Sequence, residues 1–268
     1  MEIVLLVYFA VVGVVIGSFL NVCIYRIPKE ENIAYPPSHC GNCGKRLKVF
    51  DLVPVFSWLF LKGKCRYCRS KISPRYAIVE LLTGLTFALL YNKFGLSVDL
   101  LASAFLMSIL IAVFFIDIDH KIIPDELVVT GLAAGAIIII YNIFFPMQIY
   151  RGGQWWDPIV GMIVGSGTLL VIGLIGMIIY KTDEAMGGGD IKIFAPIGIF
   201  LGWKMTLLAL LLSVVLAGLI SFILIILKVK DRRSTIPFGP FIVMGTFITY
   251  LYGWDILEFY ISTLVLRG

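Results

Sequence analysis

Two aspartates and three glycines mark a place in this chain where chemistry could occur. Asp117 follows the apolar run IAVFFI, and Asp190 follows Gly187, Gly188 and Gly189. An acidic residue inside or at the edge of a membrane span is costly, which makes it a candidate for function. Two carboxylates that share a site cannot both ionise easily, so together they can activate a water molecule for attack on a peptide carbonyl. The alternative is that each aspartate only ends a helix at the lipid headgroups.

The residues around Asp190 predict a loop that can move. Glycines allow close backbone approach and unusual dihedral angles, so we expect residues 187–189 and Lys192 to form an active-site loop. Such a loop could bring Asp190 towards Asp117 when substrate arrives. Lys192 could compensate the charge of Asp190 or bind lipid headgroups, and the sequence leaves both roles open.

Other polar residues near these two aspartates have structural interpretations. Asp125 follows a proline and precedes an apolar run, which is typical of the start of a helix. Asp119 points away from Asp117 if that helix continues. Asp183 and Glu184 are expected in a solvated loop. The side chain of His120 is expected to lie at the membrane–water interface.

Four cysteines predict a metal site. Cys40 and Cys43 form CGNC, and Cys65 and Cys68 form CRYC, with 21 residues between the pairs. Two CxxC knuckles at this separation are typical of a tetrahedral zinc site with four cysteine ligands, and four filled positions indicate a structural rather than a catalytic metal. The alternative is a pair of disulfides, which are rare in the reducing cytoplasm where we expect this segment. Cys23 is expected to be a buried apolar side chain.

The composition indicates a membrane protein that positions these groups on helices. The chain is 60% hydrophobic and 15% charged, with a mean hydropathy of +0.98, against about 45–50% and 25% in soluble domains. We therefore predict an all-α polytopic membrane protein with about eight transmembrane helices, because helices satisfy the backbone in lipid. A last stretch, 255–266, could lie at the interface. The predicted spans are 3–25, 76–91, 98–117, 127–145, 159–180, 191–203, 205–227 and 236–252.

The charged residues divide the chain into three predicted parts. Residues 1–25 form a first, retained transmembrane helix, because Glu2 replaces the positive start of a secretory signal. Residues 26–75 form a small basic cytoplasmic zinc-binding domain inserted between the first two helices. Residues 76–268 form the transmembrane domain that carries the two aspartates. The net charge of +5 does not indicate nucleic-acid binding, since the basic residues lie in short loops between apolar spans.

The distribution of basic residues predicts the orientation. With the N-terminus outside and alternating spans, eighteen of the 22 Lys and Arg residues lie on the inner side, as the positive-inside rule requires. Both termini are then outside. The loops that contain residues 117–125 and 181–190 both face the cytoplasm. Asp117 ends the third span and Asp190 begins the sixth, so the two carboxylates are expected at similar depth near the same face.

With these residues in place, the chain resembles the bacterial type IV prepilin peptidases, which are membrane aspartic proteases of the GxGD type. The resemblance implies that Asp117 and Asp190 are the catalytic pair and excludes Asp119 from that role. One departure is CGNC, where members often have proline after the first cysteine, and it does not affect ligation. The resemblance covers nearly the whole chain through the two CxxC pairs and through GSFLNVCIYRIP (17–28), SWLFLKGKCRYC (57–68), ISPRYAIVELLTG (72–84), IDIDHKIIPD (116–125) and GGGDIK (187–192).

The resemblance also implies substrates and a second activity. Members cut the leader from prepilins and pseudopilins of type IV pilus and type II secretion systems, at the cytoplasmic face of the bacterial inner membrane. Many then methylate the new N-terminus with S-adenosylmethionine, an activity linked to the cysteine-bearing cytoplasmic domain that this chain contains. The expected partners are these substrates and membrane lipid, without nucleic acid. The methyltransferase residues stay unassigned, with four weak candidates whose alternative role is packing or helix-end pairing: Gly17, Asn21, Arg26 and Glu80.

Two other functions compete with this interpretation. One is another GxGD intramembrane protease, such as an archaeal preflagellin peptidase, which the four-cysteine insert and GSFLNV disfavour. The other is a transporter whose acidic pair carries protons or cations. Transporters often contain internal repeats, and this sequence has no convincing repeat.

Overall fold

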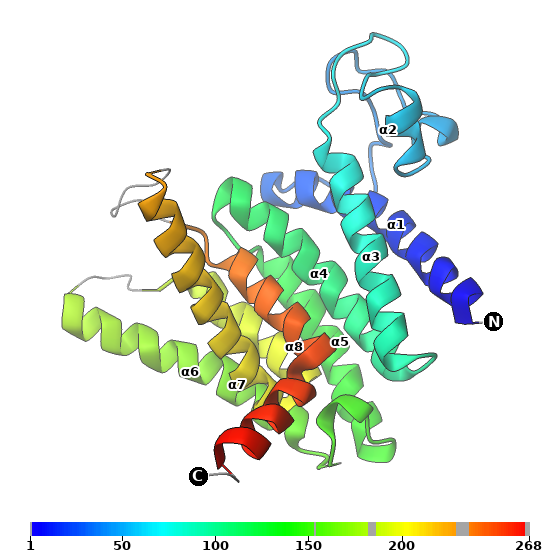
Figure 1. Cartoon of the computed structure of the whole chain (residues 1–268). Helices are drawn as coiled ribbons and strands as arrows, with labels where there is room; N and C mark the ends of the chain where they lie inside the picture. Colours follow the sequence, from blue (N-terminus) through cyan, green and yellow to red (C-terminus); the bar gives the residue numbers. More distant parts are fainter. Residues whose placement is uncertain (1, 153, 182–185, 229–235, 266–268) are drawn as a thin grey trace. The chain divides into compact units, whose positions relative to one another are not determined.

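A computed structural model describes residues 2–152, 154–181, 186–228 and 236–265 (Figure 1). The regular elements of these residues are all helical, as predicted. Seven helices of the described residues are long and apolar enough to cross a membrane. The chain divides into two compact units, Met1–Leu96 and Ser97–Gly268, and each is described by itself.

The first unit is built on two long helices, α1 (Glu2–Arg26) and α3 (Arg75–Phe94), which pack against each other. Glycines allow this close approach: a Cβ at Gly17 would lie 2.7 Å from Cα of Glu80, and one at Gly84 would lie 2.5 Å from a methyl group of Val14. Small residues at the contact are typical of helix pairs in membranes, where close packing replaces the hydrophobic effect. Between the two helices the chain forms the short elements η1 (Ile27–Lys29), η2 (Val49–Asp51) and α2 (Phe56–Phe60).

The described part of the second unit contains five long helices. Its core lies around α7, which packs against α5, α6 and α8, while α4 packs against α8. The tightest contact joins α6 to α7, where a Cβ at Gly161 would overlap the carbonyl group of Gly198. The elements of this unit are α4 (Val98–His120), α5 (Asp125–Phe144), η3 (Gln148–Tyr150), α6 (Asp157–Tyr180), α7 (Gly188–Ile226), α8 (Gly239–Tyr260) and η4 (Ile261–Val265).

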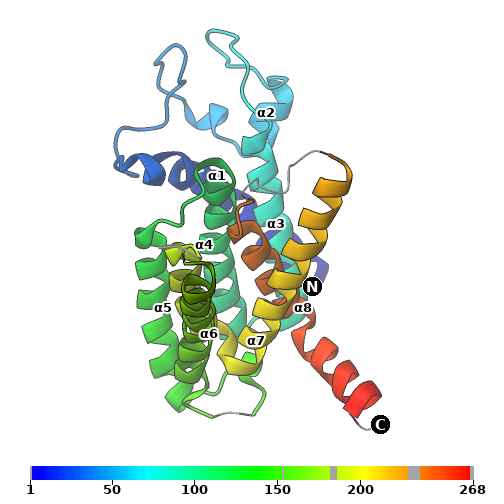
Figure 2. The same ribbon diagram turned by 90° about the vertical axis from the view of Figure 1, so that its left-hand side faces the viewer.

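Helix α7 contains two of the predicted spans in one element of 39 residues. The spans predicted at 191–203 and 205–227 are both helical, but they join at Gly202, whose φ of 71° and ψ of 165° are not helical. Figure 2 shows the second half as the yellow-to-orange helix that leaves this break. The sequence therefore predicted about eight spans where the described residues form seven long helices, one of them broken. Helix α8 also continues to Tyr260, so it includes part of the stretch assigned to the interface.

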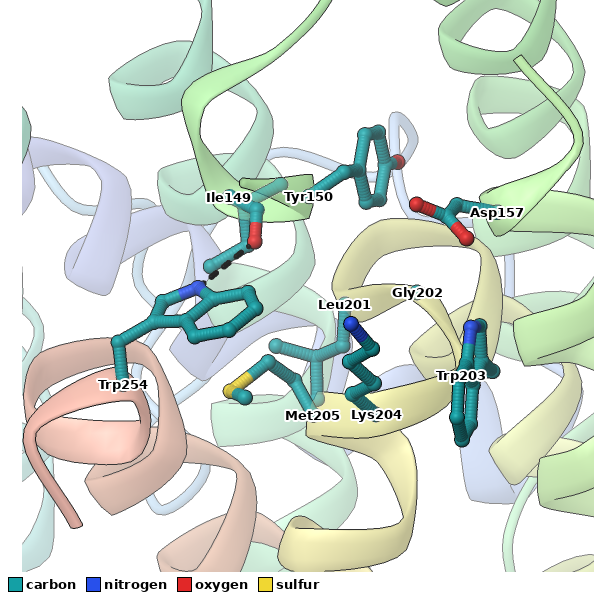
Figure 3. Close-up of a pocket in the computed structure, with 9 residues that line it drawn as sticks. All are labelled: Ile149, Tyr150, Asp157, Leu201, Gly202, Trp203, Lys204, Met205 and Trp254. Carbon is teal, nitrogen blue, oxygen red and sulfur yellow. Dashed lines mark hydrogen bonds between the residues drawn. The ribbon is translucent and has the colours of Figure 1, made fainter. Parts of the chain in front are cut away.

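The break in α7 packs against η3, which is itself bonded to α8 (Figure 3). The Tyr150 hydroxyl donates a hydrogen bond of 2.7 Å to the carbonyl of Ile199, in the turn of α7 before Gly202. A Cβ at Gly202 would lie 2.8 Å from the Tyr150 ring, so glycine suits both the dihedral angles and the space there. The Trp254 indole N–H donates to the carbonyl of Ile149, which fixes α8 to η3. This end of the second unit is thus tightly packed, and its cavity has a volume of only about 10 Å³.

Candidate active site

The opposite end of the second unit contains a large cavity of about 610 Å³. Cavities of this volume are typical of sites for small ligands or peptide segments. Asp117 and Asp190 both line it, as the sequence predicted when it placed their loops on the same side. Its walls come from the end of α4 and residues 121–123, the start of α5, the start of α7 with Gly187, and residues 236–238 before α8.

Asp117 lies in the last turn of α4 and its side chain is buried, with only 5% of the residue exposed. Its Oδ2 atom accepts a hydrogen bond of 2.8 Å from the backbone N–H of Gly239, the first residue of α8. The first N–H groups of a helix have no partner within the helix, and the helix dipole favours negative charge there. The start of α8 therefore orients this carboxylate. A Cβ at Gly239 would lie 2.6 Å from the same oxygen, so no larger residue fits without displacing Asp117.

Gly239 is a site residue that the sequence analysis missed. Its signal is FGP at residues 238–240, because proline in the first turn marks a helix start. That start follows the segment 228–233, rich in basic residues, which the charge count already placed on the same side as the two aspartates. The sequence thus indicated a helix N-terminus at the correct end of the molecule, but not which carboxylate it would meet.

Asp190 lies in the first turn of α7 and is partly exposed. Its side chain lines the same cavity as that of Asp117. Gly187 caps the helix and its carbonyl accepts a hydrogen bond of 3.1 Å from the N–H of Asp190. The two carboxylates therefore approach one cavity from different helices, as a shared acid–base pair requires.

Two of the three glycines leave room for neighbouring side chains that a larger residue would overlap. A Cβ at Gly187 would lie 2.8 Å from Oδ2 of Asp190, and one at Gly189 would lie 2.9 Å from Cβ of Ile123. At Gly188 a Cβ would meet nothing within 4 Å. Close packing thus explains Gly187 and Gly189, whereas the expected movement of this loop stays a prediction.

Lys192 has a partner that the sequence analysis did not consider. Its Nζ atom lies 2.8 and 3.0 Å from the two carboxylate oxygens of Asp125, which is the first residue of α5. Both side chains are more than half exposed. The ion pair joins the helix that carries Asp190 to the start of α5, on the wall of the cavity.

Three other polar residues near the two aspartates lie in the described part of the chain. Asp119 and His120 are exposed at the end of α4, and neither lines the cavity. Asp125 begins a helix as predicted. Asp183 and Glu184 lie outside the described residues.

The first unit brings the four predicted metal ligands together. The Sγ atoms of the four cysteines all lie within 4.8 Å of one another, and none forms a disulfide. Those of Cys40 and Cys68 are 3.8 Å apart, which matches the edge of about 3.8 Å that Zn–S bonds of about 2.3 Å give in a tetrahedron. The Ser70 hydroxyl lies 3.1 Å from Sγ of Cys68, and the hydroxyl and N–H of Ser70 lower the pKa of that thiol to about 6. The donor set therefore fits a divalent metal of the zinc type.

The two cysteine pairs have the same backbone turn. The N–H of Cys40 donates to the carbonyl of Lys45, and the N–H of Cys65 donates to the carbonyl of Ser70. The residue after each second cysteine has a positive φ, 68° at Gly44 and 58° at Arg69. This repetition is typical of two knuckles that hold one ion between them.

The four weak methyltransferase candidates all lie at or near the contact of α1 with α3. Gly17 lets the helices approach, and the Asn21 amide donates to the carbonyl of Tyr76 at 3.0 Å. The buried Arg26 guanidinium donates to backbone carbonyls, among them that of Asn32 at 2.9 Å. Glu80 accepts a hydrogen bond of 2.6 Å from the N–H of Val55. Each candidate thus has a structural role, and a role in methylation stays a prediction.

Two family models match the chain at the places where these groups lie. Residues 11–94 match the bacterial peptidase A24 N-terminal domain, which includes all four metal-site cysteines. Residues 104–223 match the type IV leader peptidase family, which includes both aspartates.

Three curated relatives match over nearly their whole length, and each is named prepilin leader peptidase/N-methyltransferase. The Pseudomonas putida protein is 32% identical over 96% of this chain and 93% of its own length. The Bacillus subtilis protein is 34% identical over 93% and 95%, and the Aeromonas hydrophila protein is 31% identical over 95% and 94%. No solved structure matches the chain significantly. With its aspartates and cysteines inside the matched regions, the chain belongs to the type IV leader peptidase family.

Proposed function

We propose that this protein is a membrane aspartic endopeptidase that removes the leader from type IV prepilins or pseudopilins and then methylates the new N-terminal amine. The observation that carries the peptidase assignment is that Asp117 and Asp190 line one cavity from two different helices. The relatives named above supply the substrate class and the second activity. Zn²⁺ is the metal assigned to the four cysteines, and S-adenosylmethionine is the methyl donor.

The two aspartates would share one proton and hold a water molecule between them. The ionised carboxylate takes a proton from the water as its oxygen attacks the scissile carbonyl carbon, while the protonated carboxyl group donates its proton to the carbonyl oxygen. The tetrahedral intermediate then collapses: the C–N bond breaks, the leaving amine takes a proton from the pair, and a hydroxyl group of the intermediate returns a proton to the pair as the new carboxyl group forms. The N–H of Gly239 keeps the carboxylate of Asp117 in place during these steps.

The position of the site suits a substrate that is itself a membrane helix. The cavity opens where the helices that carry the two aspartates begin or end. The basic loops support a cytoplasmic location for this end under the positive-inside rule. A prepilin helix lying in the bacterial inner membrane would present the bond after its leader at this depth. The proposed protein is therefore a multi-pass inner-membrane enzyme with a cytoplasmic active site.

One assay tests both activities. Membranes that contain the protein are incubated with a prepilin and labelled S-adenosylmethionine, and leader cleavage and methyl incorporation are scored separately. We expect cleavage followed by methylation of the processed pilin. Absence of cleavage from membranes with the correctly inserted protein would reject the peptidase assignment.

A further inference from the structure

The cysteine-bearing segment contains an apolar run that its metal site does not explain. Residues 52–61 read LVPVFSWLFL, and they form the approach to α2 and the helix itself. Several of these side chains are widely exposed: 60% of Phe56, 55% of Leu59 and 83% of Phe60. Such a concentration of exposed apolar residues marks an interaction surface.

One side chain of helix α2 packs against the rest of the cysteine-bearing segment, and three others face away from it. The Trp58 indole N–H donates a hydrogen bond of 3.2 Å to the carbonyl of Ile72, and its ring approaches Gly63. Phe56, Leu59 and Phe60 stand at positions i, i+3 and i+4, which lie together on one side of a helix. Trp58 thus fixes α2 to the rest of the segment, while the other three side chains point outward together.

A hydrogen bond fixes the start of α2 at one position along the axis of α3. The N–H of Val55, the residue before α2, donates to Oε2 of Glu80 at 2.6 Å. Glu80 is five residues beyond Arg75, the start of α3, so it lies about 7.5 Å along a helix that rises about 1.5 Å per residue. Helix α3 has 20 residues, or about 30 Å, which is the thickness of the hydrocarbon core. With α3 crossing the hydrocarbon core from Arg75, the start of α2 would lie at or slightly inside the membrane boundary, not out in the water.

The basic residues on both sides of this apolar run favour contact with an anionic surface. Lys45, Arg46 and Lys48 precede it, Lys62 and Lys64 follow it, and all five are exposed or partly exposed. Between residues 38 and 73 the acidic residue is Asp51, which is paired with Arg66 at 2.5 Å and with the Tyr67 hydroxyl at 2.9 Å. Clusters of basic residues beside a membrane span attract anionic lipid headgroups.

We propose that residues 52–61 anchor the four-cysteine segment to the lipid surface, with Phe56, Leu59 and Phe60 inserted among the acyl chains. The ten-residue run is too short to span a bilayer and has a suitable length for an interfacial segment. The neighbouring lysines and Arg46 contact anionic headgroups. This anchor holds the metal site at a fixed height beside the ends of α1 and α3.

Photo-crosslinking of the full chain in bilayers tests this anchor. Benzoylphenylalanine replaces Phe56 or Phe60, and in a control it replaces Asn42, an exposed residue of the first cysteine pair. Metal content confirms that each variant keeps the four-cysteine site. We expect lipid adducts from positions 56 and 60 and at least several-fold fewer from position 42. Crosslinks from position 60 to residues 97–268, or no lipid adduct, would overturn the proposal.

A second measurement tests the charges. The pair of substitutions Lys62→Glu and Lys64→Glu should lower the yield of lipid adduct at position 60 several-fold in bilayers with anionic lipid. The same pair should have little effect in purely zwitterionic bilayers. Equal effects in the two bilayers would contradict the role given to the basic residues.

Discussion

The backbone N–H of Gly239 donates a 2.8 Å hydrogen bond to Oδ2 of Asp117, which lies 122 positions earlier in the chain. This contact ties the start of α8 to the end of α4. It also leaves no room for a side chain, because a Cβ on Gly239 would lie within 3.0 Å of three Asp117 atoms. We therefore regard Gly239 as the residue that positions Asp117.

Gly239→Ala should lower the rate of prepilin cleavage about 100-fold, since a displacement of about 1 Å in a catalytic group can cost that much. The rate constant should fall more than the apparent substrate affinity. Gly218→Ala is the matched control, because a Cβ there would meet nothing within 4 Å. Cleavage at the wild-type rate by Gly239→Ala would contradict the positioning role.

The glycines before Asp190 should differ in their tolerance of alanine. Gly189→Ala should reduce cleavage strongly, about tenfold or more, because its Cβ would press on Ile123. Gly188→Ala should cause a smaller loss, because the space beside it is open. Cleavage rates measured side by side check this order. An equal or larger loss at Gly188 would indicate that backbone freedom, and not space, is what the glycines supply.

The Lys192–Asp125 ion pair should act on activity more than on stability. An exposed ion pair contributes about 0–1 kcal/mol to folding, so Lys192→Asp should leave thermal unfolding nearly unchanged. It should lower cleavage several-fold by loosening the start of α7. Asp125→Lys added to Lys192→Asp should restore part of the rate, because the swapped charges can pair again. No recovery in the double variant would reject this contact as the cause.

Metal binding should depend on the four paired cysteines and not on the fifth. Cys40→Ser with Cys65→Ser should abolish zinc binding, measured by elemental analysis of the purified protein, and should loosen the segment between α1 and α3. Cys23→Ala is the control, because Cys23 is buried in α1 away from the cluster. Stoichiometric zinc in the double variant would remove the ligand assignment.

Much of this architecture could be predicted because lipid limits the choices. Apolar runs of about 20 residues must be helices, and basic loops orient them, so Asp117 and Asp190 could be assigned to one end of the molecule. The CxxC spacing likewise indicated four cysteines as candidate metal ligands, and the structure brings their Sγ atoms within 4.8 Å of one another.

The remaining features depend on contacts between distant residues. Gly239 meets Asp117 through the packing of α8 on α4, which no local pattern reports. Lys192 meets Asp125 across 67 positions. The two predicted spans meet at the break at Gly202, where Tyr150 and Asp157 pack against α7 from other parts of the chain. Sequence periodicity specifies which residues face lipid or protein, but not which partner each will meet.

The central claim is that Asp117 and Asp190 form one catalytic pair, and the most direct measurement is leader cleavage by Asp117→Asn and Asp190→Asn in membranes. Each substitution keeps the shape of the side chain but removes its ability to take up and release a proton. We expect each variant to lose prepilin cleavage by at least about 1,000-fold, while it still inserts, binds zinc and methylates an already processed pilin. Cleavage at the wild-type rate by either variant would contradict the pair.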